Sequence, residues 1–171
     1  MPVGHCEMEW QMPEFQAYYR ALAEGRTLVR YDCRGTGLST RTAVDWSIDA
    51  QVQDVLAVAD AVGVETFDVL AMLTAAQCGI ALSAGVPARV RRLVLYSPYA
   101  RGEDYFGHPQ VEAGVAAMRA DFPLYCEMAA NHVLGGFGGD VARRHAAVFS
   151  ASHTQEAALA FVAESSELDV S

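Results

Sequence analysis

The chain contains no lysine, because all twelve of its basic residues are arginines. Schiff-base chemistry and the P-loop lysine that holds nucleotide phosphates are therefore both excluded. The 21 acidic residues outnumber the bases and give a net charge of −9, so the chain lacks the positive charge with which proteins bind nucleic-acid backbones. The short cluster of Arg89, Arg91 and Arg92 is interpreted as the solvated start of a strand. We expect no nucleic-acid partner.

Long apolar runs and paired cysteines are also lacking. No stretch approaches the length of about 18 apolar residues that spans a membrane, and Glu7 and Glu9 stand where a secretory signal carries positive charge. The cysteines form no CxxC pair and have no histidine at metal-ligand spacing; they are Cys6, Cys33, Cys78 and Cys126. We expect a cytoplasmic protein with buried free thiols, no metal, no cofactor and no membrane contact.

What the chain does contain is enough apolar sequence for one folded domain. Its 171 residues are 52% hydrophobic and 19% charged, which is far from the composition of disordered proteins. Three β-prone runs are predicted at 27–32, 66–71 and 92–97, separated by two helices. This alternation predicts an α/β fold with a short parallel sheet, a βαβαβ core.

Helices are expected before, between and after these strands. The first begins at Pro13 and closes at Gly25, the second follows Ser47, and the third covers about 74–84. From residue 102 to the end no β-rich run appears, so the second half is predicted to be all helical. Its last helix is expected to start at Ser152 or Thr154.

A ligand is expected in the loops after Asp32, Ala71 and Ser97, since open α/β sheets bind ligands beyond the carboxyl ends of their strands. Gly35-x-Gly37 could begin a dinucleotide fingerprint, but Thr40 occupies the place of the third glycine. The stretch from Asp32 to Ser39, DCRGTGLS, instead resembles the Asp-x-Arg-Gly-x-Gly-x-Ser motif of α/β-hydrolase-fold proteins. The later segments, including RRLVLYSPYARG at 91–102, agree with that family in order and spacing.

Within that family the chain is most similar to hydrolase-like domains found alone or fused to adenylate cyclases and LuxR-type regulators. The resemblance implies a partial hydrolase core over 1–101 and a helical, cap-like segment over 102–171 in the same domain unit. It also implies truncation at both ends, because the family's early strands and the regions of its catalytic acid and histidine have no counterpart. The strand that precedes Met1 in the family would lie between 27–32 and 66–71.

The catalytic turn departs from the family pattern. Such enzymes place a serine on a sharp strand-to-helix turn written G-x-S-x-G, whereas the aligned residues here are Ala71 to Ala75, AMLTA, with Leu73 at the nucleophile position. A leucine cannot attack a carbonyl, so no catalytic residue is intact. Thr74, one residue later, is the only substitute considered. His5 falls in the oxyanion-loop region, and with Met72, Leu73 and Thr74 it forms the set of pocket candidates.

The remaining histidines, Cys78 and Asp32 are interpreted as structural residues. His108, His132, His145 and His153 all lie in the helical half and are interpreted as surface or helix-face residues. Cys78 is expected in the core of the helix after the turn. Asp32 is expected to be a structural carboxylate of its turn, as the family resemblance implies.

Three functions are left open. The first is a truncated or degenerate hydrolase-fold protein without serine-hydrolase activity, which would bind or associate instead. The second is a working ester or acyl hydrolase, through Thr74 or as a segment of a longer enzyme. The third is a sensor or partner module of a regulator that holds a small apolar ligand or ester. Unpaired strand edges would also permit self-association.

Overall fold

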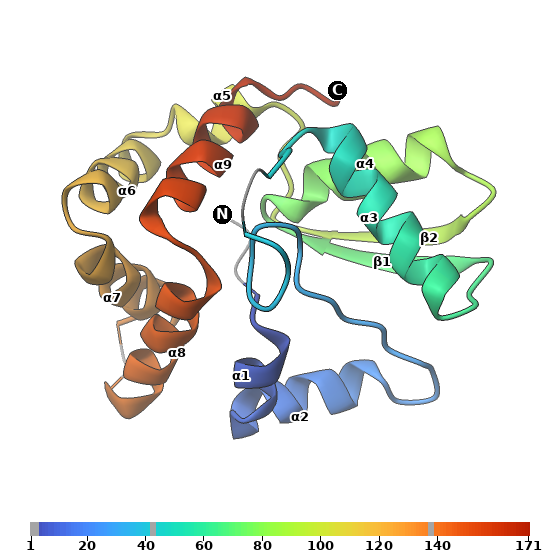
Figure 1. Ribbon diagram of the computed structural model, residues 1–171, viewed down its shortest axis with the longest axis horizontal. Coiled ribbons are helices and arrows are strands. Elements are labelled where there is room, and N and C mark those ends of the chain that lie inside the picture. The colour runs from blue at the N-terminus through green and yellow to red at the C-terminus, as the bar shows by residue number, and fades with distance from the viewer. Residues whose placement is uncertain (1–3, 42–43, 137–138) are drawn as a thin grey trace.

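In the computed structural model the chain is a mixed α/β structure, described over residues 4–41, 44–136 and 139–171 (Figure 1). Two strands form its sheet: β1 (Phe67–Met72) and β2 (Val90–Tyr96) pair in parallel in the register Leu70 to Val94. Helix α4 (Ala75–Gly85) connects them and packs on both, and α3 (Ile48–Ala61) packs on α4. The predicted βαβ unit is present, with boundaries within two residues of those expected.

Close packing of α4 on the sheet depends on a glycine. A Cβ atom at Gly79 would lie 2.8 Å from the Cβ of Ala71, which is nearer than unbonded side chains approach. The absence of a side chain at Gly79 therefore lets the helix lie directly on β1. The side chains of Leu93 and Leu95 on β2 border the same contact.

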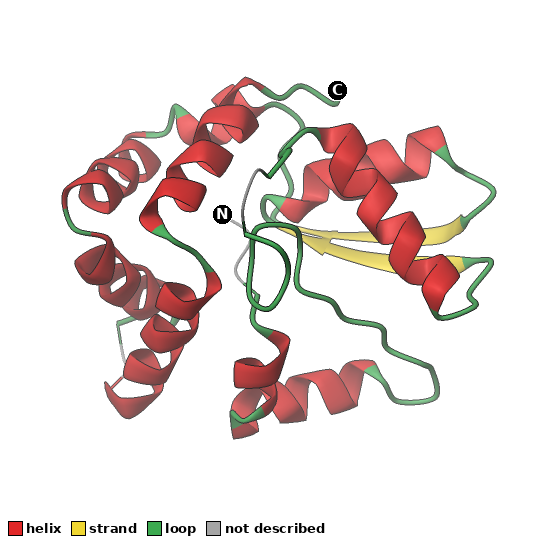
Figure 2. Ribbon diagram, viewed as in Figure 1, coloured by secondary structure: helices red, strands yellow, loops and turns green. Residues whose placement is uncertain are grey.

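The strand predicted over 27–32 is not formed. This segment follows α1 (Cys6–Trp10) and α2 (Pro13–Leu22), and it runs beside the sheet without joining it (Figure 2). None of its backbone N–H groups is hydrogen-bonded to another backbone group in the described parts of the chain. A strand requires a neighbouring strand to pair with, and none lies beside this one, so the expected βαβαβ core is a βαβ core. The short helix α1 was not expected.

The second half is helical, as predicted. Its helices, given in order, are α5 (Gly102–Phe106), α6 (Pro109–Ala120), α7 (Phe122–Val133), α8 (Gly139–Ser152) and α9 (Gln155–Glu167). The last begins after Thr154, whose hydroxyl oxygen accepts a hydrogen bond from the N–H of Ala157 at 3.2 Å. The alternative start at Ser152 is therefore wrong, because Ser152 ends α8.

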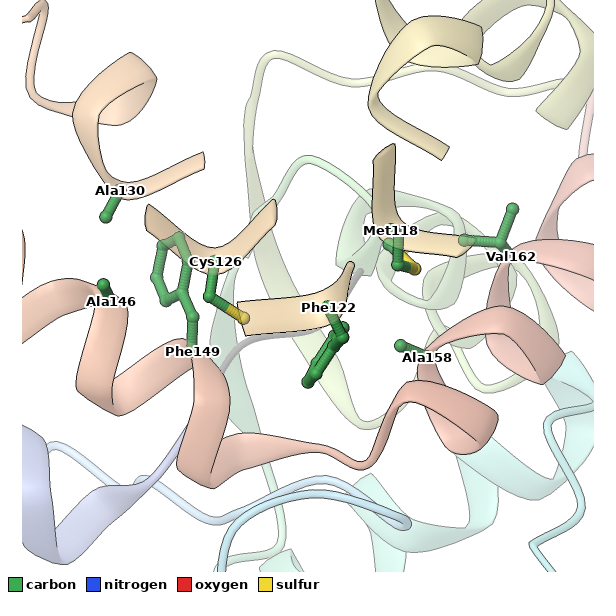
Figure 3. Close-up of a cluster of buried hydrophobic side chains, with 8 residues drawn as sticks. All are labelled: Met118, Phe122, Cys126, Ala130, Ala146, Phe149, Ala158 and Val162. Carbon is green, nitrogen blue, oxygen red and sulfur yellow. The ribbon is translucent and has the colours of Figure 1, made fainter. Parts of the chain in front are cut away.

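A hydrophobic core lies inside this helical half. Figure 3 shows Cys126 of α7 beside Phe149 of α8, and Phe122 of α7 between Cys126 and Ala158 of α9. The full set of buried side chains in the cluster is Met118, Phe122, Cys126, Ala130, Ala146, Phe149, Ala158 and Val162. The alanines let the helices approach closely around the larger side chains.

The turn at 33–41 joins the helical half to the rest. The N–H of Gly37 donates to the carbonyl oxygen of Ser152 at 3.0 Å, and the guanidinium of Arg41 donates to the carbonyl oxygen of Ala151 at 2.6 Å. The ring of Trp46 meets the ring of Phe161 edge-on, with 5.2 Å between centroids. The turn therefore packs against the corner between α8 and α9.

All four cysteines are free thiols. Cys78 and Cys126 are buried as expected, whereas Cys6 and Cys33 are only partly buried. No helix in the described ranges is both long and apolar enough to cross a membrane.

Candidate functional site

The carboxyl ends of the two strands carry the unusual backbone of the molecule. Leu73 follows β1 and Ser97 follows β2, and both have a φ of 51°, in the left-handed region that non-glycine residues rarely adopt. Such residues persist where the surrounding structure holds them, and they concentrate at functional sites. Because parallel strands end at the same sheet edge, the two left-handed residues are neighbours.

Leu73 forms the apex of a sharp turn between β1 and α4. Its N–H donates to the carbonyl oxygen of Tyr96 at 3.0 Å, and its own carbonyl oxygen accepts from the N–H of Ala76 at 3.0 Å. These bonds hold the left-handed residue from both sides. The side chain points outward and is 43% exposed, which is the presentation that a strand-turn-helix nucleophile requires.

Thr74 lies one residue further on and is oriented differently. It has right-handed helical angles, its side chain is buried, and its hydroxyl makes no capping bond to α4. Within the described parts of the chain no hydrogen bond joins this hydroxyl to a histidine or a carboxylate. The arrangement therefore offers Thr74 no base to remove its proton.

Met72 is the third residue expected at this turn. Its sulfur accepts a hydrogen bond from the Tyr18 hydroxyl of α2 at 3.8 Å. Its side chain is exposed, as are those of Leu73 and Tyr96. The strand ends thus present an apolar surface rather than a polar catalytic group.

His5 lies at the N-terminus of α1 and is buried. Its Nδ1 accepts from the N–H of Met8 at 3.4 Å, and its backbone N–H donates to a Glu9 carboxylate oxygen at 3.4 Å. No hydrogen bond in the described structure links His5 to Leu73 or Thr74, so the histidine acts as a helix cap.

Asp32 holds the turn that carries the family motif. Its two carboxylate oxygens accept the backbone N–H of Cys6 at 2.7 Å and that of Leu38 at 3.0 Å. Burial raises the pKa of Asp32. The hydrogen bonds from Leu38 and Cys6, together with the nearby His5, lower it by more than burial raises it, so the pKa lies below its usual value. This is the structural role that was expected of Asp32.

The other histidines and Cys78 show no catalytic arrangement. His108 and His132 are exposed, and the Nδ1 of His145 lies 3.0 Å from the carbonyl oxygen of Val141 one turn earlier in α8. His153 is buried. Burial raises the pKa of the Cys78 thiol to about 12, so it is not a nucleophile at neutral pH. No cluster of three metal-ligating residues occurs in the described ranges.

A buried ionic cluster near α1 was missed by sequence reasoning. Glu9 is buried, forms an ion pair with Arg30, and accepts a hydrogen bond from the Tyr19 hydroxyl at 2.6 Å. The guanidinium carbon of Arg30 lies 3.4 Å from the centre of the Tyr19 ring. Burial raises the pKa of Tyr19. These residues are 10 to 21 positions apart, and no spacing rule connects them.

Comparisons with known proteins agree with this geometry. A hydrolase from Oleispira antarctica superposes with a TM-score of 0.72 at 14% identity, over 94% of this chain and 61% of its own. The esterase EaEST from Exiguobacterium antarcticum gives 0.73 at 15% identity, over 99% and 64%. MGS-M2, an α/β-hydrolase enzyme from a deep-sea metagenome, gives 0.63 at 14% identity, over 98% and 62%. The chain therefore shares the fold of these hydrolases over most of its length.

Curated relatives match a shorter stretch. The protein named "Putative carbamate hydrolase RutD" from Caulobacter segnis is 33% identical over 88 residues, which is 50% of this chain and 33% of that protein. Its namesake from Azorhizobium caulinodans is 34% identical over 85 residues, 50% and 32% of the two chains. This chain thus spans about a third of these relatives' length, and no protein-family profile matches it.

Proposed function

We propose that this chain is a hydrolase-fold protein that does not hydrolyse esters, amides or carbamates through the turn between β1 and α4. The observation that carries the proposal is Leu73, which holds the left-handed apex of that turn with an exposed side chain. The backbone shape used to present a nucleophile is kept, but a leucine side chain has neither a lone pair nor a proton to transfer.

The strain at this turn supports the proposal. A left-handed conformation costs an ordinary residue roughly 1–2 kcal/mol, and here it stabilises no reacting group. Ala71 and Gly79 still provide the close packing of helix on strand that the turn requires. The simplest account is a hydrolase ancestor whose nucleophile was replaced while the packing around it remained.

The relatives are named for carbamate hydrolysis, and we do not assign this activity to this chain. It would require a nucleophile and a base, and Thr74 is the only hydroxyl at the turn. Thr74 is buried, and His5 uses its Nδ1 to cap α1. A working hydrolase, by Thr74 or as part of a longer enzyme, stays the alternative.

Model substrates and covalent labelling test the proposal. The purified chain is incubated with p-nitrophenyl acetate, p-nitrophenyl butyrate and p-nitrophenyl N-methylcarbamate, and separately with a fluorophosphonate probe read by intact-protein mass spectrometry. We expect nitrophenol release at the rate of buffer and no adduct. Saturable turnover or stoichiometric labelling would contradict the proposal. The variants Thr74→Ala and Ser97→Ala then identify the hydroxyl responsible, with Ser83→Ala, near the opposite end of α4 from the turn, as a control.

A binding role is the second candidate, and the exposed apolar strand ends favour it. Met72, Leu73 and Tyr96 lie at the carboxyl ends of β1 and β2, where open α/β sheets bind ligands, and all three are exposed. A small apolar ester would gain from covering them. Thermal shift with a series of acyl esters and lactones tests this role: a shift that Leu73→Asp abolishes supports it, and no shift across the series contradicts it.

A further inference from the structure

A cavity of about 400 Å³ lies between α1, α2 and the segment 27–32. In Figure 1 the chain turns after α2, and this segment runs back above that helix. The volume falls within the range of about 300–1,000 Å³ that is usual for small-molecule sites. The wall of the cavity is formed mainly by Trp10, Tyr19, Arg20, Ala23, Leu28 and Arg30.

This cavity is separate from the turn between β1 and α4. Helix α2 contacts β1 through Tyr18, whose hydroxyl donates to the sulfur of Met72 at 3.8 Å. Successive residues of a helix point about 100° apart, so Arg20 points nearly opposite to Tyr18. The cavity therefore lies on the side of α2 that faces away from β1, and none of the described residues of the turn lines it.

Arg30 is held in place at the wall of the cavity. Its guanidinium forms an ion pair with the buried carboxylate of Glu9, and its guanidinium carbon lies 3.4 Å from the centre of the Tyr19 ring. The Tyr19 hydroxyl donates to the same carboxylate at 2.6 Å. The Arg30 bond to Glu9 comes from Nη2, and in the described parts of the chain Nε and Nη1 have no acceptor. Arg30 is thus a fixed cation with unused N–H groups.

Arg20 is the second cation at the cavity, and its charge is not balanced. Its guanidinium carbon lies 5.7 Å from the centre of the Trp10 ring, which is the distance of a cation–π contact. Among the residues that the structure describes, no carboxylate pairs with Arg20 and no acceptor takes its N–H groups. Glu9 balances Arg30 instead. Burial raises the pKa of the Cys6 thiol, which also lines the cavity, to about 12, so this thiol is neutral.

The rest of the wall is apolar. The side-chain amide of Gln16 in α2 donates to the carbonyl oxygen of Trp10 at 2.6 Å, which ties the end of α1 to α2. Trp10 is 47% exposed and Leu28 is 37% exposed. A ligand that covered these two side chains would remove apolar area from water, which favours binding. The cavity therefore combines two cations with an exposed apolar surface.

We propose that this cavity binds a small monocarboxylate, with its carboxylate on Arg20 and Arg30 and its apolar ring or chain on Trp10 and Leu28. A planar guanidinium donates two parallel hydrogen bonds to a carboxylate, and the single negative charge of the ligand balances Arg20. A phosphate monoester carries nearly two negative charges at pH 7, so it would bring one charge too many beside Glu9. The proposal does not depend on what the turn at Leu73 does.

The chain contains two tryptophans, and they supply a probe and a reference. Trp10 lines the cavity, whereas Trp46 is buried against Phe161. The full chain is titrated with 4-phenylbutyrate at up to millimolar concentration, and the two indole N–H signals are followed by NMR. We expect the Trp10 signal to shift and saturate while the Trp46 signal stays in place. The neutral 4-phenylbutanamide, which has the same shape, should bind at least about tenfold more weakly, and phenyl phosphate should also bind more weakly.

A pair of variants tests the role of Arg20. Arg20→Gln removes its charge and should weaken 4-phenylbutyrate binding at least about tenfold. Arg119→Gln is the matched control and should leave binding unchanged, because Arg119 is an exposed residue of α6 and does not line the cavity. Circular dichroism checks that both variants fold, and the comparison of acid with amide needs no variant. A Trp10 signal that does not move, equal binding of acid and amide, tighter binding of phenyl phosphate, or equal effects of the two variants would each overturn the proposal.

Discussion

The N–H of Leu73 donates to the carbonyl oxygen of Tyr96, the last residue of β2, at 3.0 Å. Ser97, which follows Tyr96, has the same left-handed conformation as Leu73. The turn after β1 is thus held by the end of β2. A shape that a hydrolase uses to expose a nucleophile survives here because the sheet maintains it. The backbone at this position is left-handed, and the side chain that it exposes is a leucine.

Glycine at position 73 should show that the turn is strained. Leu73 and Leu70 are both 43% exposed, but only Leu73 has a positive φ. Leu73→Gly relieves a strain of roughly 1–2 kcal/mol, so we expect its free energy of unfolding to equal or exceed that of the parent. Leu70→Gly, within β1, should lower it by about 1 kcal/mol. Urea unfolding of both variants makes the comparison, and an equal loss would show that Leu73 is unstrained.

The packing of α5 against α9 should require a residue without a side chain at position 102. A Cβ there would overlap the carbonyl oxygen of Ser165, whereas a Cβ at Gly85 meets nothing within 4 Å. We expect Gly102→Ala to cost about 1–3 kcal/mol of stability, and Gly85→Ala, at the end of α4, to cost nothing. Thermal unfolding by circular dichroism measures both. Equal melting temperatures would show that α9 moves aside at no cost.

Asp32 should contribute a pH-dependent part of the stability. Its pKa is lower in the folded protein than the ordinary value of 3.8, so the carboxylate stabilises the fold above that value. The contribution disappears as pH falls through the folded pKa, because the proton then binds the unfolded chain first. The difference in unfolding free energy between the parent and Asp32→Asn should therefore be largest at neutral pH and shrink below pH 3.8. Denaturation at several pH values tests this, and a constant difference contradicts it.

The cysteine thiols should react slowly while the chain is folded. Burial is the largest cause that raises their pKa values, to about 12 for Cys6 and Cys78 and about 11 for Cys126, and it raises that of Cys33 as well. Few thiolates exist at pH 8, so iodoacetamide should modify the native protein far more slowly than the protein in urea. Mass spectrometry over time follows the modification. Rapid labelling of one cysteine in the native state would show a reactive site.

Local sequence patterns predicted most helices and the two paired strands. Pro13, Ser47 and Thr154 marked helix starts that the structure confirms. The run at 27–32 has the same β-prone character as the strands, yet it is unpaired. Whether such a run becomes a strand depends on a neighbour with free backbone groups, and composition contains no information about that neighbour.

The candidate site, like the fold, was predicted from the sequence only in part. The sequence alone predicted Leu73 at the nucleophile position. It also excluded acyl-enzyme chemistry at that position, because the chemical groups of a residue are fixed by its identity. It also predicted the structural role of Asp32. The Glu9, Arg30 and Tyr19 cluster and the left-handed Ser97 were decided by tertiary structure. Each arises where segments distant along the chain come together, and residue identity limits such contacts without specifying them.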